Sequence, residues 1–151
     1  MKVYSKLFVL ILAMTPLRMT IAQDYKADDI LGTWMNEDKD AHIEIFKEDG
    51  MYFGKIVWLK DPIDEETGKP KVDEENPDEA LQDRPIMGLV LLKNFEFEGG
   101  DEWEDGSIYD PKNGKTYSCY MELKGMDKLK IRGYVGISLL GRTTYWTRVD
   151  E

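Results

Sequence analysis

The sequence predicts an all-β protein folded as an antiparallel up-and-down β-barrel of about eight strands. Apolar and polar residues alternate over segments of 5 to 10 residues, as strands with one buried face require. Turn motifs such as Asp49-Gly50 and Asn113-Gly114 connect these segments. No segment has the periodicity of an amphipathic helix. Closing the sheet removes its exposed edges, so we favour a barrel, with a two-sheet sandwich as the alternative.

The N-terminus has the three parts of a secretory signal peptide, which we assign to residues 1–22. Lys2 and Lys6 precede an apolar run over residues 7–14, and Thr20-Ile21-Ala22 gives a small-x-small cleavage pattern. The apolar run is too short to span a bilayer. We therefore expect cleavage near Ala22, a single β-barrel domain over residues 23–151, and export to the periplasm or the cell exterior.

The expected strands follow one another along this domain. In the second strand Ile43 and Ile45 alternate with His42 and Glu44, and an Asp-Gly hairpin turn precedes the third. The segment DPKNGK over residues 110–115 is interpreted as a turn whose composition is explained by turn chemistry alone. The eight expected strands cover residues 31–35, 42–47, 51–59, 86–97, 103–109, 116–124, 128–137 and 142–149.

One connection is too long for a meander of tight turns. Residues 60–85 contain ten acids and four prolines. A connection of this length inside a compact domain is usually functional or disordered. It is either a solvated acidic excursion or a lid over one barrel mouth, with Asn76-Pro77 and Arg84-Pro85 as fixed corners. A lesser alternative is a calcium site formed by the acids between Asp73 and Asp78. Residues 79–83 are expected to allow one helical turn.

The net charge argues against one class of partner. The whole chain carries −10, and removal of residues 1–22, which hold Lys2, Lys6 and Arg18, leaves −13. A surface of this sign repels phosphate backbones, whereas nucleic-acid binding starts from a basic footprint. We therefore expect no nucleic-acid partner, and a mature protein that is not an integral membrane protein.

The residues of several common active sites are missing from the sequence. His42 and Cys119 are the single histidine and the single cysteine, so the common zinc sites and a Cys–His pair cannot be assembled. There is no G-x-S-x-G motif, the acids single out no catalytic pair, and no segment has EF-hand spacing. Cys119 alternates with Tyr117 and Met121, so we expect a buried thiol. The sequence predicts no catalytic residue, no metal site and no cofactor.

Residues that bind a small molecule inside a barrel point inward from alternate strand positions. Over residues 129–135 one stripe is apolar and the other holds Lys130, Arg132 and Tyr134. Either the apolar stripe faces inward, or the basic stripe does so and meets a polar head group. The second arrangement gives the candidate interior residues Trp58, Tyr109, Tyr117, Arg132 and Tyr134.

Six sequence blocks occur in order along the mature chain. They are GTW, YFGKIVWL, the block from Asp73 to Gly88, the block from Trp103 to Tyr117, LKIRGYVG, and the C-terminal R-T-x-x-W-T-R-V. Together they resemble the bacterial family called domain of unknown function 2147. The resemblance implies an exported bacterial protein with a lipocalin-like (calycin-type) barrel, and it implies no activity. Its motif in the acidic loop consists of Asp73, Asn76, Pro77, Arg84, Pro85 and Gly88.

Gly32 and Trp34 form a G-x-W motif similar to that of lipocalins, at the first expected strand. In those barrels the tryptophan packs across the closed end against an arginine from a late strand, here Arg142 or Arg148. Trp146 and Arg148 share one face of the last strand, so Arg148 can stack on Trp146 or meet Trp34. We interpret Gly32, Trp34, Trp146 and Arg148 as a barrel-closing cluster. The chain lacks the disulfide that many lipocalins carry.

Three functions are compatible with these observations. The leading one is an exported noncatalytic barrel that binds a small apolar or amphipathic molecule. The second is a structural or protein-interaction module of the cell envelope with a filled barrel. The third, a carboxylate-dependent hydrolase, ranks last. An internal cavity distinguishes the first hypothesis from the second.

Overall fold

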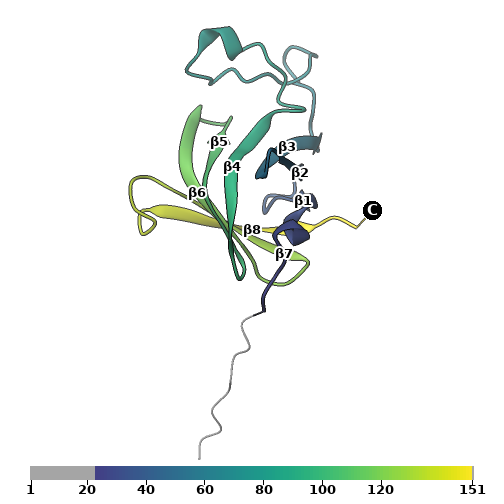
Figure 1. Cartoon of the computed structure of the whole chain (residues 1–151). Helices are drawn as coiled ribbons and strands as arrows, with labels where there is room; N and C mark the ends of the chain where they lie inside the picture. Colours follow the sequence, from purple (N-terminus) through teal and green to yellow (C-terminus); the bar gives the residue numbers. More distant parts are fainter. Residues whose placement is uncertain (1–22, 151) are drawn as a thin grey trace, which may run out of the picture.

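The computed structural model describes residues 23–150, so the predicted signal peptide, residues 1–22, lies outside the described residues. Two short 3₁₀ helices and eight strands make up the fold (Figure 1). The elements are η1 (Ala27–Ile30), β1 (Gly32–Met35), β2 (Ala41–Glu48), β3 (Met51–Leu59), η2 (Glu79–Leu81), β4 (Val90–Gly99), β5 (Glu102–Asp110), β6 (Lys115–Leu123), β7 (Lys128–Tyr134) and β8 (Gly141–Arg148).

The eight strands form a closed antiparallel barrel in sequence order. Each strand pairs with the next, and the last pairs with the first, where Trp34 lies opposite Arg148. The predicted up-and-down barrel is therefore confirmed, and the sandwich alternative is wrong. Closure pairs the backbone groups that an open sheet would leave exposed at its two edge strands.

The fourth strand is shorter than predicted, because β4 begins at Val90 and not at Ile86. Ile86 to Leu89 form a turn, in which the Leu89 N–H donates to the Ile86 carbonyl at 3.1 Å. Gly88 has a φ of 86°, a conformation that side chains disfavour. The long connection between β3 and β4 therefore ends at Leu89, four residues later than the predicted loop.

The alternating direction of the strands gives the barrel two different ends. The β2–β3, β4–β5 and β6–β7 turns lie at one end, where η1 also packs. We call it the closed end. The β1–β2, β5–β6 and β7–β8 turns lie at the other end, together with the connection from Lys60 to Leu89. We call it the open end.

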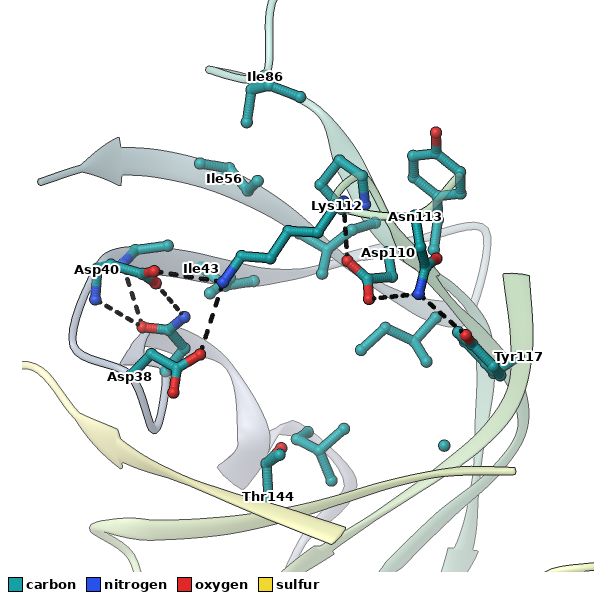
Figure 2. A pocket seen from close by; sticks show the side chains of 18 of the residues that line it. Asp38, Asp40, Ile43, Ile56, Ile86, Asp110, Lys112, Asn113, Tyr117 and Thr144 are labelled. Atoms are coloured by element: carbon teal, nitrogen blue, oxygen red, sulfur yellow. Dashed lines mark hydrogen bonds and ion pairs between the residues drawn. The ribbon is translucent and has the colours of Figure 1, made fainter. Parts of the chain in front are cut away.

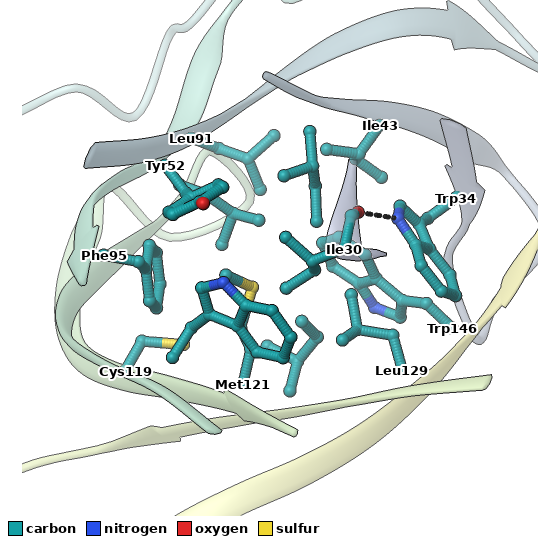
Figure 3. Close-up of a cluster of buried hydrophobic side chains, with 14 of the residues drawn as sticks. Ile30, Trp34, Ile43, Tyr52, Leu91, Phe95, Cys119, Met121, Leu129 and Trp146 are labelled. Atoms are coloured by element: carbon teal, nitrogen blue, oxygen red, sulfur yellow. Dashed lines mark hydrogen bonds between the residues drawn. The ribbon is translucent and has the colours of Figure 1, made fainter. Parts of the chain in front are cut away.

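Large side chains fill the barrel toward the closed end (Figure 3). Trp34 and Trp103 are fully buried, and the indole N–H groups of both donate to backbone carbonyls, of Ile30 at 3.0 Å and of Ala27 at 3.1 Å. The indole nitrogen is the only polar atom of each side chain. Its hydrogen bond to a carbonyl replaces the one it would make to water, which offsets the desolvation of the N–H group. The other fully buried large residues here include Ile30, Ile45, Tyr52, Phe95, Met121 and Leu129.

Arg148 joins the two ends of the chain at the closed end. Its guanidinium lies over the Trp34 indole, 4.2 Å from the ring centroid, and donates to the carbonyls of Met126, Leu31 and Asp29 at 2.6–2.7 Å. A Cβ at Gly32, whose φ is 121°, would lie 2.9 Å from the Arg148 Nη1 atom. Glycine thus leaves room for the guanidinium. Of the two arginines expected near Trp34, Arg148 is the one that packs there.

Candidate functional site

The open end of the barrel contains a cavity of about 710 Å³ (Figure 2). Its base is apolar, and the residues that line it come from seven strands, β2 to β8, and from the connections at this end. Apolar area and a shape enclosed by strands are the usual properties of a small-molecule site. The apolar residues deep in the cavity are Ile43, Ile56, Leu91, Ile108, Ile131 and Trp146.

Along two of the strands, β7 and β2, the inward side chains become smaller toward the open end. Along β7 the inward series runs from Leu129 and Ile131 to Gly133, which has no side chain. Along β2 it runs from Ile45 and Ile43 to Ala41. The same backbone ladder therefore encloses a packed core at one end and empty volume at the other, since interior packing depends on side-chain volume.

One wall of the cavity carries a hydrogen-bonded group of Asp110, Asn113 and Tyr117. The Asn113 amide donates to the Asp110 carboxylate at 3.0 Å and to the Tyr117 hydroxyl oxygen at 3.1 Å. Because that oxygen accepts the amide hydrogen, the hydroxyl keeps its own proton as a donor. Asp110 lies two positions after Ile108 on the same inward face of β5. This wall of the cavity thus presents a polar and an apolar side chain next to each other.

Lys112 reaches across the mouth of the cavity. Its ammonium lies 3.6 Å from the Asp38 carboxylate and 3.5 Å from that of Asp40, both in the β1–β2 turn (Figure 2). Partial burial acts to raise the pKa of Asp40, but hydrogen bonding to Asn36 and the charge of Lys112 outweigh it and lower that pKa. Asp40 is therefore ionised at neutral pH, and a positive and two negative charges face each other at the mouth.

The rim of the cavity is acidic overall. Seven carboxylates and three cationic side chains are among the residues that line it. The carboxylates belong to Glu37, Asp38, Asp40, Asp61, Asp64, Glu74 and Asp110, and the cations to Lys71, Lys112 and Arg142.

A buried carboxylate holds the long connection against the barrel. Asp73 is inaccessible to solvent and accepts hydrogen bonds from Tyr109 at 2.6 Å, Asn76 at 2.8 Å and Arg84 at 2.8 Å. Burial acts to raise the pKa of Asp73, but these three donors prevail and keep it below its usual value. The anchored segment places Val72, Glu74 and Ile86 on the cavity wall.

The loop motif residues are brought together by this network. Asp73, Asn76 and Arg84 bond directly, and Pro85 forms a bridge with Val72 that positions the two strands of the connection. Pro77 lies against Gly114 in the β5–β6 turn. The expected helical turn is η2, a single turn of 3₁₀ helix.

The prediction of an interior position is wrong for Trp58 and Arg132. Trp58 is 40% exposed and packs against His42, with ring centroids 4.4 Å apart and the ring planes tilted by 34°, because a β-bulge shifts the register between His42 and Ile43. Arg132 points away from the barrel, and its guanidinium donates to the carbonyl of Ser138 at 2.7 Å and to the Thr143 hydroxyl at 2.8 Å. The apolar stripe of β7 is the one that faces inward.

The three tyrosines among the predicted residues line the cavity, but only Tyr117 does so from an inward strand position, because Tyr134 shares the outward stripe of Arg132 and Tyr109 alternates with the inward Ile108 and Asp110. Tyr117 belongs to its polar wall and Tyr134 to its rim. Tyr109 lies where the cavity meets the long connection, and its hydroxyl is already engaged by Asp73 and Asn76. Tyr117 is therefore the member of the set best placed to contact a bound molecule.

The segment from Asp110 to Lys115 has more than the turn role that its sequence indicated. It forms the β5–β6 turn, but its side chains Asp110, Lys112 and Asn113 also line the cavity. The sequence signal was present in the alternation, because Ile108 and Asp110 share one face of a strand. From the sequence, the six apolar residues at the base of the cavity could be recognised only as candidates for the hydrophobic core.

Three further observations concern the described residues. Within residues 23–150, no three histidine, cysteine, aspartate or glutamate side chains gather closely enough to hold a metal ion. Over that range no helix has the length and apolar character that a bilayer crossing requires. Cys119 is buried, and burial raises the pKa of its thiol to about 12.

A family model described as "Uncharacterized protein conserved in bacteria (DUF2147)" matches residues 32–148, so the chain belongs to this family. No curated protein matches the sequence. Among solved structures, protein HP1028 from the human pathogen Helicobacter pylori, described as belonging to the lipocalin family, is similar with a TM-score of 0.71 and 22% identity. The alignment covers 80% of this chain and 83% of that one. The likeness shows a lipocalin-like fold.

Proposed function

We propose that this member of the DUF2147 family is an exported, noncatalytic barrel that binds a small apolar or amphipathic molecule in the open-end cavity. The observation that carries the proposal is the cavity itself, about 710 Å³ in volume with an apolar base. Ligand sites for small molecules have volumes of roughly 300–1,000 Å³ and are mostly apolar. The cavity has the size and composition of such a site.

The shape of the barrel supports a binding role over the alternative of a filled structural module. A module that acts only through its surface gains stability from a packed interior, because close-packed side chains make dispersion contacts that the walls of an open pocket lack. The closed end is packed, with Trp34, Phe95 and Trp103 fully buried. Retaining a cavity at the other end is consistent with occupation by a ligand.

Export is part of the proposal and is supported by the sequence of residues 1–22. A basic start, an apolar run over residues 7–14 and a small-x-small pattern at Ala22 are the features of a cleaved signal peptide. Fractionation of the native cells followed by intact mass measurement tests this directly. We expect a periplasmic or secreted species that begins at Gln23, and a full-length cytoplasmic chain would contradict it.

Binding is tested by titration with the neutral apolar dye N-phenylnaphthylamine. We expect fluorescence enhancement from a single site. The variant Ile108→Trp fills the cavity from β5 and should weaken binding by about tenfold or more, because it displaces the ligand from the apolar base. The matched control Tyr145→Trp adds a tryptophan at an exposed position of β8 outside the cavity lining and should leave binding unchanged. Equal binding by all three proteins would contradict the proposal.

Native mass spectrometry of the protein purified from its own compartment complements the titration. A copurifying small molecule that is lost in Ile108→Trp but kept in Tyr145→Trp would assign it to the cavity. A protein that carries no small molecule and shows no thermal shift with a panel of lipids and metabolites would count against the proposal.

A further inference from the structure

We propose that the ligand of the open-end cavity is an amphipathic cation, with an apolar body in the base and an ammonium-type head group at the rim. This inference rests on the proposed function and adds the chemical class of the ligand. It is carried by the charge of the rim, by its position relative to the apolar base, and by the way in which Lys112 occupies the mouth.

The rim offers a cation a favourable electrostatic environment. Its seven carboxylates outnumber its three cationic side chains by four. Charges of one sign around a concave, partly apolar site reinforce one another and concentrate ions of the opposite sign. An anionic head group such as a fatty acid carboxylate would meet the same excess of negative charge as a repulsion. The charge balance thus selects a cation.

The rim and the base are close enough to be contacted by one small amphipathic molecule. Ile108 and Asp110 point into the cavity from adjacent inward positions of β5, about 7 Å apart along the strand. Asp40, in the turn immediately before β2, also lines the cavity, three residues from Ile43 in the base. A ligand with its apolar part on the isoleucines therefore brings its head group to the carboxylates.

Lys112 shows where such a head group would lie. Its ammonium is shared by Asp38 and Asp40 over the mouth, so the protein already places one primary ammonium at this position (Figure 2). The contacts, 3.6 and 3.5 Å, are at the outer limit of hydrogen bonding, and the Lys112 side chain is 71% exposed. Exposed pairs of this kind are weak. A ligand ammonium can replace Lys112 and leave that side chain in solvent.

The test compares three ligands that share a decyl tail and differ in head group, namely decylammonium, decyl maltoside and decanesulfonate, each below its micelle concentration. Calorimetry at low salt should give decylammonium about tenfold tighter binding than the neutral maltoside, with the sulfonate weakest. Added salt should reduce the difference, because the rim is open to solvent.

Three variants assign the preference to the rim. Asp38→Asn combined with Asp110→Asn keeps the side-chain shapes and should weaken decylammonium about tenfold, with a much smaller change in maltoside affinity. The control removes two acids outside the cavity lining, Glu96→Gln with Glu98→Gln on β4, and should leave all three affinities unchanged. Lys112→Met should strengthen decylammonium, since its competitor is gone.

The outcomes separate this inference from the proposed function. Equal affinity for the three ligands, preference for the sulfonate, or a cation preference that survives loss of Asp38 and Asp110 overturns the inference and leaves ligand binding in the cavity intact. Failure of all three ligands and of the neutral dye to bind overturns both.

Discussion

The two ends of the barrel are built from the same eight strands, but they differ in what fills them. At the closed end Trp34, Tyr52, Phe95 and Trp103 fill the interior, and Arg148 covers it. At the open end Ala41, Gly133 and other small or aliphatic side chains leave about 710 Å³ empty, beneath an acidic rim. The comparison teaches that strand pairing and interior packing are separate properties of a barrel.

This separation lets one chain combine a stable fold with a binding site. Backbone pairing of β1 with β8 at Trp34–Arg148 and Met35–Thr147 closes the sheet, and the hydrophobic free energy comes mainly from the closed end, where most of the large side chains are buried. Substitutions at the closed end should therefore lower stability, and those at the open end should change binding.

Trp34→Ala should destabilise the protein by about 3–5 kcal/mol, because it removes a fully buried indole and leaves a cavity that the barrel cannot collapse. Urea denaturation followed by far-UV circular dichroism measures the loss. The same substitution at the exposed Trp58 serves as the control and should cost less than about 1 kcal/mol. Similar losses for both variants would break the comparison.

Arg148→Ala should cost about 1–3 kcal/mol, since three backbone carbonyls lose their donor and Trp34 loses its cover. Arg142→Ala, on the same face of β8 but at the cavity rim, is the control and should change stability by less than about 0.5 kcal/mol. Thermal melts monitored at several wavelengths make the measurement. An unchanged melt for Arg148→Ala would contradict its role in closing the barrel.

Asp73→Asn should detach the long connection from the barrel wall, with only a moderate loss of free energy of unfolding for the barrel. The amide cannot accept from Tyr109, Asn76 and Arg84 with the strength of a carboxylate, and we expect a loss of about 1–2 kcal/mol. Limited proteolysis should cleave residues 60–89 faster, with the barrel left intact. Asp83→Asn, at an exposed position of the same connection, is the control. Identical cleavage in the two variants would show that Asp73 is not the anchor.

The same contact predicts a dependence on acid. The pKa of Asp73 is lower in the folded chain than its unfolded value near 3.8, so its stabilisation is complete above that pH and is lost as the pH falls through the folded value. The stability difference between the native chain and Asp73→Asn should therefore shrink below about pH 4. Urea midpoints measured between neutral pH and pH 3 show this. A difference that stays constant would contradict the lowered pKa.

The smallest expected effect is a difference in stability loss between two isoleucine-to-valine variants, one at each end of the barrel. Ile45→Val, in the packed half of β2, should cost about 1 kcal/mol, since the lost methyl group leaves a void among buried neighbours. Ile108→Val, on the cavity wall, should cost less than half of that, because the methyl group already faces open volume. Chemical denaturation of the two variants in parallel provides the comparison. Equal losses would show that the open end is packed as tightly as the closed end.

Most of the fold was predictable because local rules determine it. Alternation over residues 42–59 around Asp49-Gly50 leaves few arrangements other than a hairpin, and the G-x-W motif marks the first strand. The correct side of a strand was harder to predict where the register changes. The β-bulge between His42 and Ile43 puts Trp58 outside, and no feature of the sequence announces it.

The site was less predictable than the fold, because it depends on where the inward side chains leave space unfilled. Ile43, Ile108 and Ile131 look like ordinary core residues, and a cavity appears among them only when the opposite side chains are known to be small. Asp110 and Lys112 were explained as turn residues, yet they also line the cavity. A turn can satisfy its own chemistry and still contribute side chains to a binding site.

The open end should bind the ligand, and the closed end should only stabilise the barrel. NMR of isoleucine methyl groups during titration with N-phenylnaphthylamine tests this division of roles. The ring current of the dye should shift the methyl signals of the isoleucines that line the cavity, Ile43, Ile56, Ile86, Ile108 and Ile131, and leave those of Ile30 and Ile45 in the closed end unchanged. Shifts at Ile30 and Ile45 without shifts at the cavity residues, or no shift at all at saturating dye, would contradict the account.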